Sequence, residues 1–401
     1  KGQYLYASDG RQYLDAVNNI SHVGHCHPRV IAALDEQNRL LNTNTRYLHD
    51  NIVTYADELT NKLPAKLDVC YFTNSGSESN DLALRMARNY TDSNQTIVIA
   101  GAYHGHTNAT IEVSPYKFDG PGGVGSPDFV HQIPMPDPYR GKFRSNNDDI
   151  ALKYADSVQQ ILDVLNEDNK QVAAFIAEAI LGCGGQIFFP EDFLAAASKK
   201  VQQAGGLFIA DEVQIGFGRV GSHFWGFESE NARPDIVTMG KSMGNGHPIS
   251  AVVTTKEIAD RFNNGMEYFN SFGGNPVSCA VGKAVLQVIE EEKLQENAFQ
   301  VGEYLMDQLN ELKQRHNIIG DVRGRGLFLG LELIKEHEKL TPASLEAEKI
   351  ANEMKDHGIL ISTDGPDHNV LKIKPPMVFT CDNADQLVET LNKLLMKGDF
   401  N

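Results

Sequence analysis

Short apolar runs alternate with amphipathic stretches through the middle of this chain. Each run is only a few residues long and is bounded by glycine or by charged residues, which is typical of buried strands. The runs lie at residues 69–73, 96–100, 172–177, 207–210 and 236–239. Between them apolar residues recur three and four positions apart, which predicts helices. Strands and helices that alternate through residues 69–255 predict an α/β fold with a mostly parallel sheet covered on both faces.

The two ends of the chain follow a different pattern. Residues 4–20 predict a hairpin around the turn signal Ser8–Asp9–Gly10. After two long helices, expected at about 277–290 and then to about 316, the pattern predicts a smaller α+β unit. Its strands are expected at 322–333, 358–362 and 370–373, and its helices at 343–357 and 383–397.

These patterns predict two domains. Residues 48–290 would form the large domain, residues 291–401 the C-terminal part of the small domain, and residues 1–47 its N-terminal part. The chain starts at Lys1, without a methionine and already in a strand-like segment, so we expect residues to be missing before it. Membership of a larger multifunctional chain is therefore one alternative.

Composition limits the possible partners. The formal net charge of −17 would repel nucleic acid and anionic membranes, and no apolar run approaches the length of a membrane span. The five cysteines are scattered without a C-x-x-C pair, which favours the reducing cytoplasm. His22, His25, Cys26 and His27 crowd together, but adjacent residues cannot readily converge on one ion. We expect no metal.

Two segments indicate binding of anions. Ser75 and Glu78 fit a capping box ahead of an amphipathic helix, so the helix N-terminus at 75–77 would offer free N–H groups to a phosphate. Plain helix capping is the alternative. Residues 114–147 predict a long loop rich in proline and glycine, in which Arg140 and Arg144 gather positive charge. A solvated basic loop is the alternative there.

An acid and a lysine follow neighbouring strands. Asp211 and Lys241 both lie at carboxyl ends of predicted parallel strands, where reactive groups of such sheets collect. They could form a structural ion pair, or a Schiff-base lysine with an acid that keeps a cofactor's pyridinium nitrogen protonated. Tyr103, after the strand at 96–100, could stack on a flat ring or belong to the core.

Together these motifs resemble the class III aminotransferase family of pyridoxal-phosphate enzymes, which has fold type I. The resemblance covers essentially the whole chain. The motifs that carry it are Ser75–Gly76–Ser77, Tyr103–His104, Asp211–Glu212–Val213–Gln214 and Gly240–Lys241. It implies that the cofactor is pyridoxal 5'-phosphate, with Lys241 as the Schiff-base and proton-transfer residue and Asp211 at the pyridine nitrogen.

The resemblance also implies the remaining cofactor contacts. They are Gln214 near the ring hydroxyl, Val213 behind the ring, Tyr103 on its other face, Gly76 and Ser77 at the phosphate, and Glu178 close by. Family members are homodimers with shared active sites, in which a hydroxyl of the neighbouring subunit reaches the phosphate. Here that position is Ser271.

Two positions depart from the common family pattern. Members that use 2-oxoglutarate pair an acid with an arginine of the small domain, and these places fall here on Cys183 and Lys372. Cysteine does not neutralise a cation, and lysine lacks the fork that grips a carboxylate. The stretches 44–50, 114–118, 138–144, 244–248 and 371–377 instead resemble the phospho-lyase branch once labelled alanine–glyoxylate aminotransferase-like. Members of that branch act on ethanolamine phosphate or 5-phosphohydroxylysine.

We therefore expect a cytoplasmic enzyme that acts on a small-molecule amine and eliminates phosphate from it. A phosphate leaving group needs cationic support. The candidates for that support are Arg140, Arg144, Lys372 and Lys374, with Arg46 as a weaker one. The alternative activity is an ω-amine or alanine-type transaminase that uses pyruvate or glyoxylate.

Overall fold

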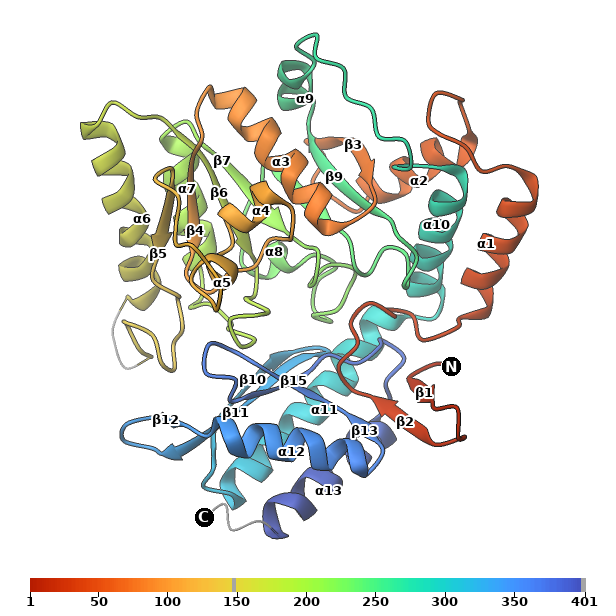
Figure 1. Ribbon diagram of the computed structural model, residues 1–401, viewed down its shortest axis with the longest axis vertical. Helices are drawn as coiled ribbons and strands as arrows, with labels where there is room; N and C mark the ends of the chain where they lie inside the picture. The colour runs from red at the N-terminus through yellow and green to blue at the C-terminus, as the bar shows by residue number, and fades with distance from the viewer. Residues whose placement is uncertain (146–148, 398–401) are drawn as a thin grey trace.

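The computed structural model describes residues 1–145 and 149–397 and has two lobes (Figure 1). The main lobe, in the upper part of the view, is built on a seven-stranded sheet. The second lobe, below it, contains a five-stranded and a three-stranded sheet with the last three helices. No helix of the described residues is both long enough and apolar enough to span a bilayer.

The seven-stranded sheet has the order β3-β9-β8-β7-β6-β4-β5. Its strands are β3 (Leu67–Thr73), β4 (Gln95–Ile99), β5 (Val130–Ile133), β6 (Val172–Glu178), β7 (Leu207–Asp211), β8 (Ile236–Met239) and β9 (Ser250–Thr255). Only β9 runs antiparallel to its two neighbours, β3 and β8. The predicted α/β class with a mostly parallel sheet is confirmed.

The central strands are apolar because helices cover both of their faces. All seven residues of β6 are buried. Ala174 and Ile176 join the core beneath α3 (Gly76–Thr91), whereas Phe175 and Ala177 join the core on the opposite face. Two helices pack together on that opposite face, α6 (Ile150–Glu167) and α7 (Phe193–Gln203). Successive residues of a strand point to opposite faces, so a strand between two helical layers needs an unbroken apolar run.

The long loop predicted at residues 114–147 is wrong in part. It contains a short helix, α5 (Pro115–Phe118), and the edge strand β5, which pairs in parallel with β4. The strand has polar residues in its centre, His131 and Gln132, and it is only four residues long, so its sequence lacks the apolar run of a central strand.

The second lobe begins after α10 (Pro276–Glu291). Its five-stranded sheet has the order β10-β11-β15-β14, with β12 paired to β11. The strands are β10 (Ile319–Arg325), β11 (Phe328–Glu336), β12 (Thr341–Pro342), β14 (Ser362–Asp364) and β15 (Val370–Ile373), and the helices are α11 (Leu294–Arg315), α12 (Ser344–Asp356) and α13 (Cys381–Lys397). The single strand predicted at 322–333 is wrong, because Gly326, at a φ of +55°, turns the chain into a hairpin.

The N-terminal hairpin is confirmed and lies in the second lobe. β1 (Tyr4–Tyr6) pairs with β2 (Gln12–Asp15), and β2 pairs in parallel with β13 (Ile359–Leu360). By contrast, α1 (Pro28–Leu40) and α2 (Asp50–Thr60) pack on α10 of the main lobe. The exact domain boundaries stay a prediction.

Candidate active site

The N-terminus of α3 forms one end of the site. Ser75 is its N-cap, and its Oγ accepts a hydrogen bond from the Glu78 N–H at 3.2 Å. The other half of the predicted capping box is wrong, because the Glu78 carboxylate accepts from the N–H of Asn74 instead. Ser77 Oγ accepts from the backbone N–H of His106 at 3.0 Å. The first turn of α3 is thus fixed from two sides.

Gly76 has no room for a side chain. A Cβ on this residue would lie 2.5 Å from Cγ1 of Val213. Val213 in turn is buried two residues beyond the end of β7. The structure therefore brings two predicted cofactor contacts, Gly76 and Val213, into direct van der Waals contact at the carboxyl edge of the sheet.

The Asp211 carboxylate accepts hydrogen bonds from three groups of the protein. Its Oδ2 accepts from Asn80 Nδ2 and from His104 Nδ1, both at 2.8 Å, and its Oδ1 accepts from the Val213 N–H at 3.1 Å. A carboxylate that accepts several hydrogen bonds is stabilised as the anion. Since it can only accept, His104 must carry its proton on Nδ1.

Neither Asn80 nor the role of His104 follows from the sequence analysis. His104 could have been noted because it directly follows Tyr103 after a strand. Asn80 carries no such signal, because only the packing of α3 on the sheet brings it to β7; its own Oδ1 accepts from Thr238 Oγ1 at 2.6 Å.

Glu178 lies beside Asp211, since the two are register partners on β6 and β7. Burial, and secondarily Asp211, raises the pKa of Glu178 to about 7. Its carboxyl group accepts from the N–H of Tyr103 at 3.4 Å and of Gly182 at 3.1 Å. The two neighbouring acids therefore differ: Asp211 accepts from two side chains and one backbone N–H, whereas in the described part of the chain Glu178 accepts from backbone N–H groups.

Gln214 joins the two lobes. Its Oε1 accepts from Asn19 Nδ2 and from Lys374 Nζ, both at 2.8 Å. Its Nε2 lies against the backbone of Gly182, where a Cβ would come within 1.9 Å of it. The amide is thus oriented by two donors from outside the main sheet, and only glycine fits behind it.

Lys241 follows β8 by two residues and is only partly exposed. Within the described parts of the chain it forms no ion pair with Asp211, whose acceptors are taken by other donors. The structural ion pair considered from the sequence is therefore wrong. Lys241 instead lies close enough to Cys183 and Lys374 to influence their pKa values.

The second lobe adds a cluster of two lysines and an acid. Asp364 Oδ2 lies 3.2 Å from Lys372 Nζ and 4.0 Å from Lys374 Nζ. Burial, followed by the charge of Lys372, lowers the pKa of Lys374 to about 7. Burial, followed by Glu178, raises the pKa of Cys183 to about 12, so this thiol stays neutral. The cluster faces Lys241 across Cys183.

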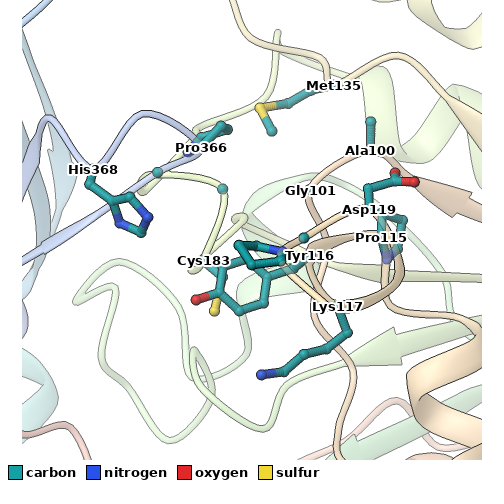
Figure 2. Close-up of a pocket in the computed structure, with 14 residues that line it drawn as sticks. Ala100, Gly101, Pro115, Tyr116, Lys117, Asp119, Met135, Cys183, Pro366 and His368 are labelled. Carbon is teal, nitrogen blue, oxygen red and sulfur yellow. The ribbon is translucent and has the colours of Figure 1, made fainter. Parts of the chain in front are cut away.

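A cavity of about 480 Å³ opens beside this cluster (Figure 2). Tyr116 and Lys117 of α5 lie on one side, and Pro366 and His368 of the second lobe lie on the other, with Cys183 between them. Tyr103 borders it through its edge-to-face contact with Tyr116, at 5.9 Å between ring centroids. We take this cavity as the candidate substrate space, because Cys183 lines it and lies close enough to Lys241 for the lysine to influence the pKa of the thiol.

Other predicted residues lie outside the cavity lining. Arg140 forms an ion pair with Glu332 and also donates to the carbonyl of Leu340. It lines a neighbouring cavity of about 190 Å³. Arg144 is exposed, as are Arg46, which lies over the ring of Phe269, and Ser271. Because its charge is already paired, Arg140 is a weaker candidate for the substrate phosphate than the sequence indicated.

The histidines considered for a metal have separate partners. His22 Nε2 bonds to the Phe217 carbonyl, and His25 Nε2 to Asp15. Over the residues described, no group of three metal-binding side chains converges.

Comparison with known proteins identifies the family. The model of the class III aminotransferases matches residues 1–395, and the chain belongs to this family. It is 51% identical over 393 residues to the Drosophila melanogaster protein named alanine–glyoxylate aminotransferase 2-like, covering 97% of this chain and 80% of that protein. It is 44% identical to the Caenorhabditis elegans ethanolamine-phosphate phospho-lyase homolog 1, covering 98% and 86%.

The fold agrees with solved structures of the same kind. A phospholyase from Arthrobacter in complex with phosphoethanolamine superposes with a TM-score of 0.94 at 38% identity, covering 99% of this chain and 93% of that one. An amine transaminase from an uncultivated Pseudomonas species, solved with pyridoxal phosphate bound, gives a TM-score of 0.91 at 27% identity, covering 99% and 93%. The cofactor is pyridoxal 5'-phosphate.

The residues present fit this cofactor. The helix α3 begins at Gly76, and the backbone N–H groups and dipole of its N-terminus favour an anion such as the cofactor phosphate. Asp211 is a buried carboxylate held by donors, as a protonated ring nitrogen requires. Lys241 is free of carboxylate partners in the described chain, so its amino group is available for a covalent link.

Proposed function

We propose that the protein is a pyridoxal-phosphate-dependent phospho-lyase that eliminates phosphate from an O-phosphorylated primary amine. The observation that carries the proposal is the lysine-rich end of the site beside Cys183, whose two lysines lie near the 480 Å³ cavity without lining it. Cys183 and Lys372 stand where 2-oxoglutarate-dependent members of the family have an acid and an arginine, and Lys372 and Lys374 gather there around one acid. This end suits a phosphate better than a dicarboxylate.

The chemistry rests on the cofactor and on three protein groups. When bound, the cofactor supplies an electron sink for a carbon next to the substrate nitrogen. Asp211, as an anion, would hold the ring nitrogen protonated. Lys241 would remove the proton from the carbon that bears nitrogen. The lysines of the second lobe would stabilise charge on the departing phosphate.

The overall reaction balances with one water. Ethanolamine phosphate loses a proton from the carbon that bears nitrogen, and the carbon–oxygen bond to phosphate breaks with its electron pair on the oxygen. The carbon that has lost phosphate then takes up a proton. Water then releases the nitrogen. The products are acetaldehyde, ammonia and inorganic phosphate, and no second substrate is consumed. The substrate is ethanolamine phosphate or phosphohydroxylysine in this proposal. The name of the C. elegans relative and the phosphoethanolamine bound in the Arthrobacter structure support the first of these compounds.

The decisive experiment omits any keto acid. The holoenzyme is mixed with ethanolamine phosphate, and free phosphate is measured over time. Release at catalytic turnover is the expected result. Phosphohydroxylysine is assayed in parallel, because release from that compound alone would change the substrate and leave the reaction type intact. No release from either compound would overturn the proposal.

The second candidate is transamination. It is favoured by the name of the 51% identical Drosophila relative and by the amine transaminase among the solved structures. Here the amino group would move to pyruvate or glyoxylate. The test is formation of alanine or glycine from an unphosphorylated amine. Activity that requires the keto acid would support this candidate against the lyase.

We also propose a homodimer in the cytoplasm. Residues 44–48 and the loop at 266–272 meet where Arg46 lies over the Phe269 ring, and both segments expose large apolar side chains: Tyr47, Leu48, Met266, Phe269 and Phe272. Ser271 lies within the second segment. Light scattering should give twice the chain mass, and a monomer with full activity would contradict the dimer. Relatives from Arabidopsis thaliana and Homo sapiens are named mitochondrial, so fractionation of cells must test the location.

A further inference from the structure

The cations around the substrate space differ in how their charge is compensated. Lys372 and Lys374 share Asp364, and Arg140 is paired with Glu332. Lys117 lines the 480 Å³ cavity, and within the described chain it lies in no ion pair. Of these four side chains, Lys117 is therefore the one whose positive charge is not compensated by a carboxylate of the described chain. Sequence analysis did not name it among the phosphate candidates, because α5 was taken for part of a loop.

Two aromatic rings hold the ammonium group of Lys117. Its Nζ lies 5.4 Å from the ring centroid of Tyr116 and 5.7 Å from that of Tyr103. Cation–π contacts of this kind fix the position of an ammonium group without using its N–H donors for an acid. Figure 2 shows the side chain reaching past Tyr116 on the side of Cys183. Three N–H groups thus remain for an anion in the cavity.

The short helix that carries Lys117 is anchored to the catalytic edge of the sheet. Tyr116 donates its N–H to the Ala102 carbonyl, and Phe118 is buried in the core beneath. Ser114 Oγ, just before the helix, accepts from the N–H of His104 at 2.9 Å. The position of Lys117 is therefore fixed relative to the residues around Asp211. A group that binds a reacting substrate needs such a fixed position.

The one carboxylate in the cavity lining does not neutralise this lysine. Asp119 also lines the cavity, but its Oδ2 accepts from Gln132 Nε2 at 3.0 Å, which directs it toward β5. Lys374 is a weaker source of charge, because its pKa of about 7 leaves it only partly protonated at neutral pH. On the opposite wall, His368 adds a second polar group that faces the cavity.

We propose that Lys117 binds the phosphoryl group of the substrate and thereby sets the preference for phosphorylated over unphosphorylated amines. This inference rests on the proposed phospho-lyase function. A phosphate dianion binds most strongly to a cation that is not already paired with a protein carboxylate. The new charge-assisted hydrogen bond then displaces water and does not break an existing ion pair. The same contact would stabilise the phosphate as it leaves with the electron pair of the carbon–oxygen bond.

The test replaces Lys117 by methionine, which keeps the apolar stem and removes the charge. For ethanolamine phosphate we expect KM to rise roughly 10–100-fold, the range of a lost charge-assisted hydrogen bond. Lys117→Arg should raise KM less than Lys117→Met does, because the positive charge is kept. The response of the cofactor absorbance to ethanolamine, which lacks the phosphate, should not change.

Lys142→Met is the matched control. Lys142 also lies over an aromatic ring, with Nζ 5.3 Å from the Phe143 centroid, and it also lies in no ion pair of the described chain, but it is exposed and does not line the cavity. Its replacement should leave KM unchanged. An equal rise of KM in both variants would overturn the proposal, since it would reflect overall charge rather than a site.

A binding measurement separates this inference from the lyase reaction. Calorimetry of the holoenzyme with inorganic phosphate should show binding that weakens at least tenfold in Lys117→Met, whether or not the wild type releases phosphate. If phosphate binds wild type and variant equally, or binds neither, Lys117 is not the site. Absence of phosphate release from wild type with Lys117-dependent phosphate binding would reject the lyase function and retain the anion site. Lys117→Gln serves as a second variant if the methionine variant loses its cofactor absorbance.

Discussion

The two lobes contribute opposite charges to the active site. We call the side around Asp211 the main-lobe wall and the side around Lys372 and Lys374 the second-lobe wall. On the main-lobe wall, Asp211 is surrounded by side-chain and backbone donors, all within 3.1 Å. On the second-lobe wall, Lys372 and Lys374 crowd around the single acid Asp364, and burial depresses the pKa of one of them. The first wall holds one negative charge firmly, whereas the second holds more positive charge than it neutralises.

This difference separates the part of the site that serves the cofactor from the part that selects the substrate. The Asp211 carboxylate is already hydrogen-bonded within the protein. The further group that it is expected to contact is the protonated ring nitrogen of the cofactor. A wall with excess positive charge attracts an anion that the protein does not itself supply. Family membership therefore predicts the first wall, and in the proposed function the second wall favours a phosphorylated substrate.

The largest effect should come from the residue that lies between the walls. Lys241→Ala should lower phosphate release by about 10²–10⁴-fold, the usual contribution of a positioned proton-transfer group. After reduction with borohydride, wild type should also gain the mass of the cofactor, and the variant should not. Lys256→Ala, which removes a surface lysine paired with Asp260, is the control. Unchanged turnover of Lys241→Ala would contradict the central role of this lysine.

Next in size is the charge of the main-lobe wall. Asp211→Asn keeps the shape but removes the anion and turns an amide N–H₂ toward His104 and Asn80, so kcat should fall roughly 10²–10³-fold. The absorbance spectrum of the bound cofactor should shift as well. Asp235→Asn is the control, because Asp235 accepts the Phe208 N–H at the other end of β7 and should affect only stability. Equal losses of kcat in both variants would mean that Asp211 is structural.

A smaller effect should follow from disturbing the link between the walls. In Gly182→Ala the new Cβ would meet Gln214 Nε2, which must move and give up one of its contacts with Lys374 or Asn19. We expect the cofactor to bind about tenfold more weakly, the cost of roughly one neutral hydrogen bond. Equilibrium dialysis against free cofactor measures this. Gly122→Ala, whose Cβ would meet nothing within 4 Å although its φ of +81° strains an alanine, controls for strain in a loop without a clash at Gln214.

The sequence predicted the main residues of the main-lobe wall but not most of the contacts on the second-lobe wall. Strands buried on both faces need apolar runs, so β6, β7 and β8 could be located, and with them Glu178, Asp211 and Lys241 at their ends. The bonds of Asn80 and His104 to Asp211 depend on how α3 and the chain after β4 pack, which no periodicity records. These partners are 131 and 107 residues from Asp211 along the chain.

The positively charged residues show most clearly what could not be predicted from the sequence. Arg140 looked available in the sequence because its partner, Glu332, lies 192 residues away. Lys117 looked like a loop residue because α5 is four residues long, too short for a helical pattern. Which cation is compensated is a property of the tertiary structure, since a carboxylate from anywhere in the chain can do it.

The remaining expected effect concerns the free energy of unfolding and its dependence on pH. Burial lowers the pKa of Lys374 from 10.5 to about 7, so between these values the unfolded chain binds a proton that the folded chain does not. The cost to folding is therefore complete below pH 7, decreases as pH rises, and vanishes above about 10.5. Lys374→Met removes this cost, and its stability relative to wild type should be greatest at pH 6.5.

Urea unfolding at pH 6.5 and 9.5 measures the difference. Between these two values, the advantage of Lys374→Met over wild type should shrink by roughly 1–3 kcal/mol. Lys372→Met is the matched control, because Lys372 shares Asp364 but is 23% exposed, and its difference from wild type should vary much less with pH. An advantage of Lys374→Met that stays constant, or grows, toward pH 9.5 would mean that Lys374 is fully charged in the folded protein. The second-lobe wall would then carry a full additional charge at neutral pH, and Lys374 would compete with Lys117 for the phosphate.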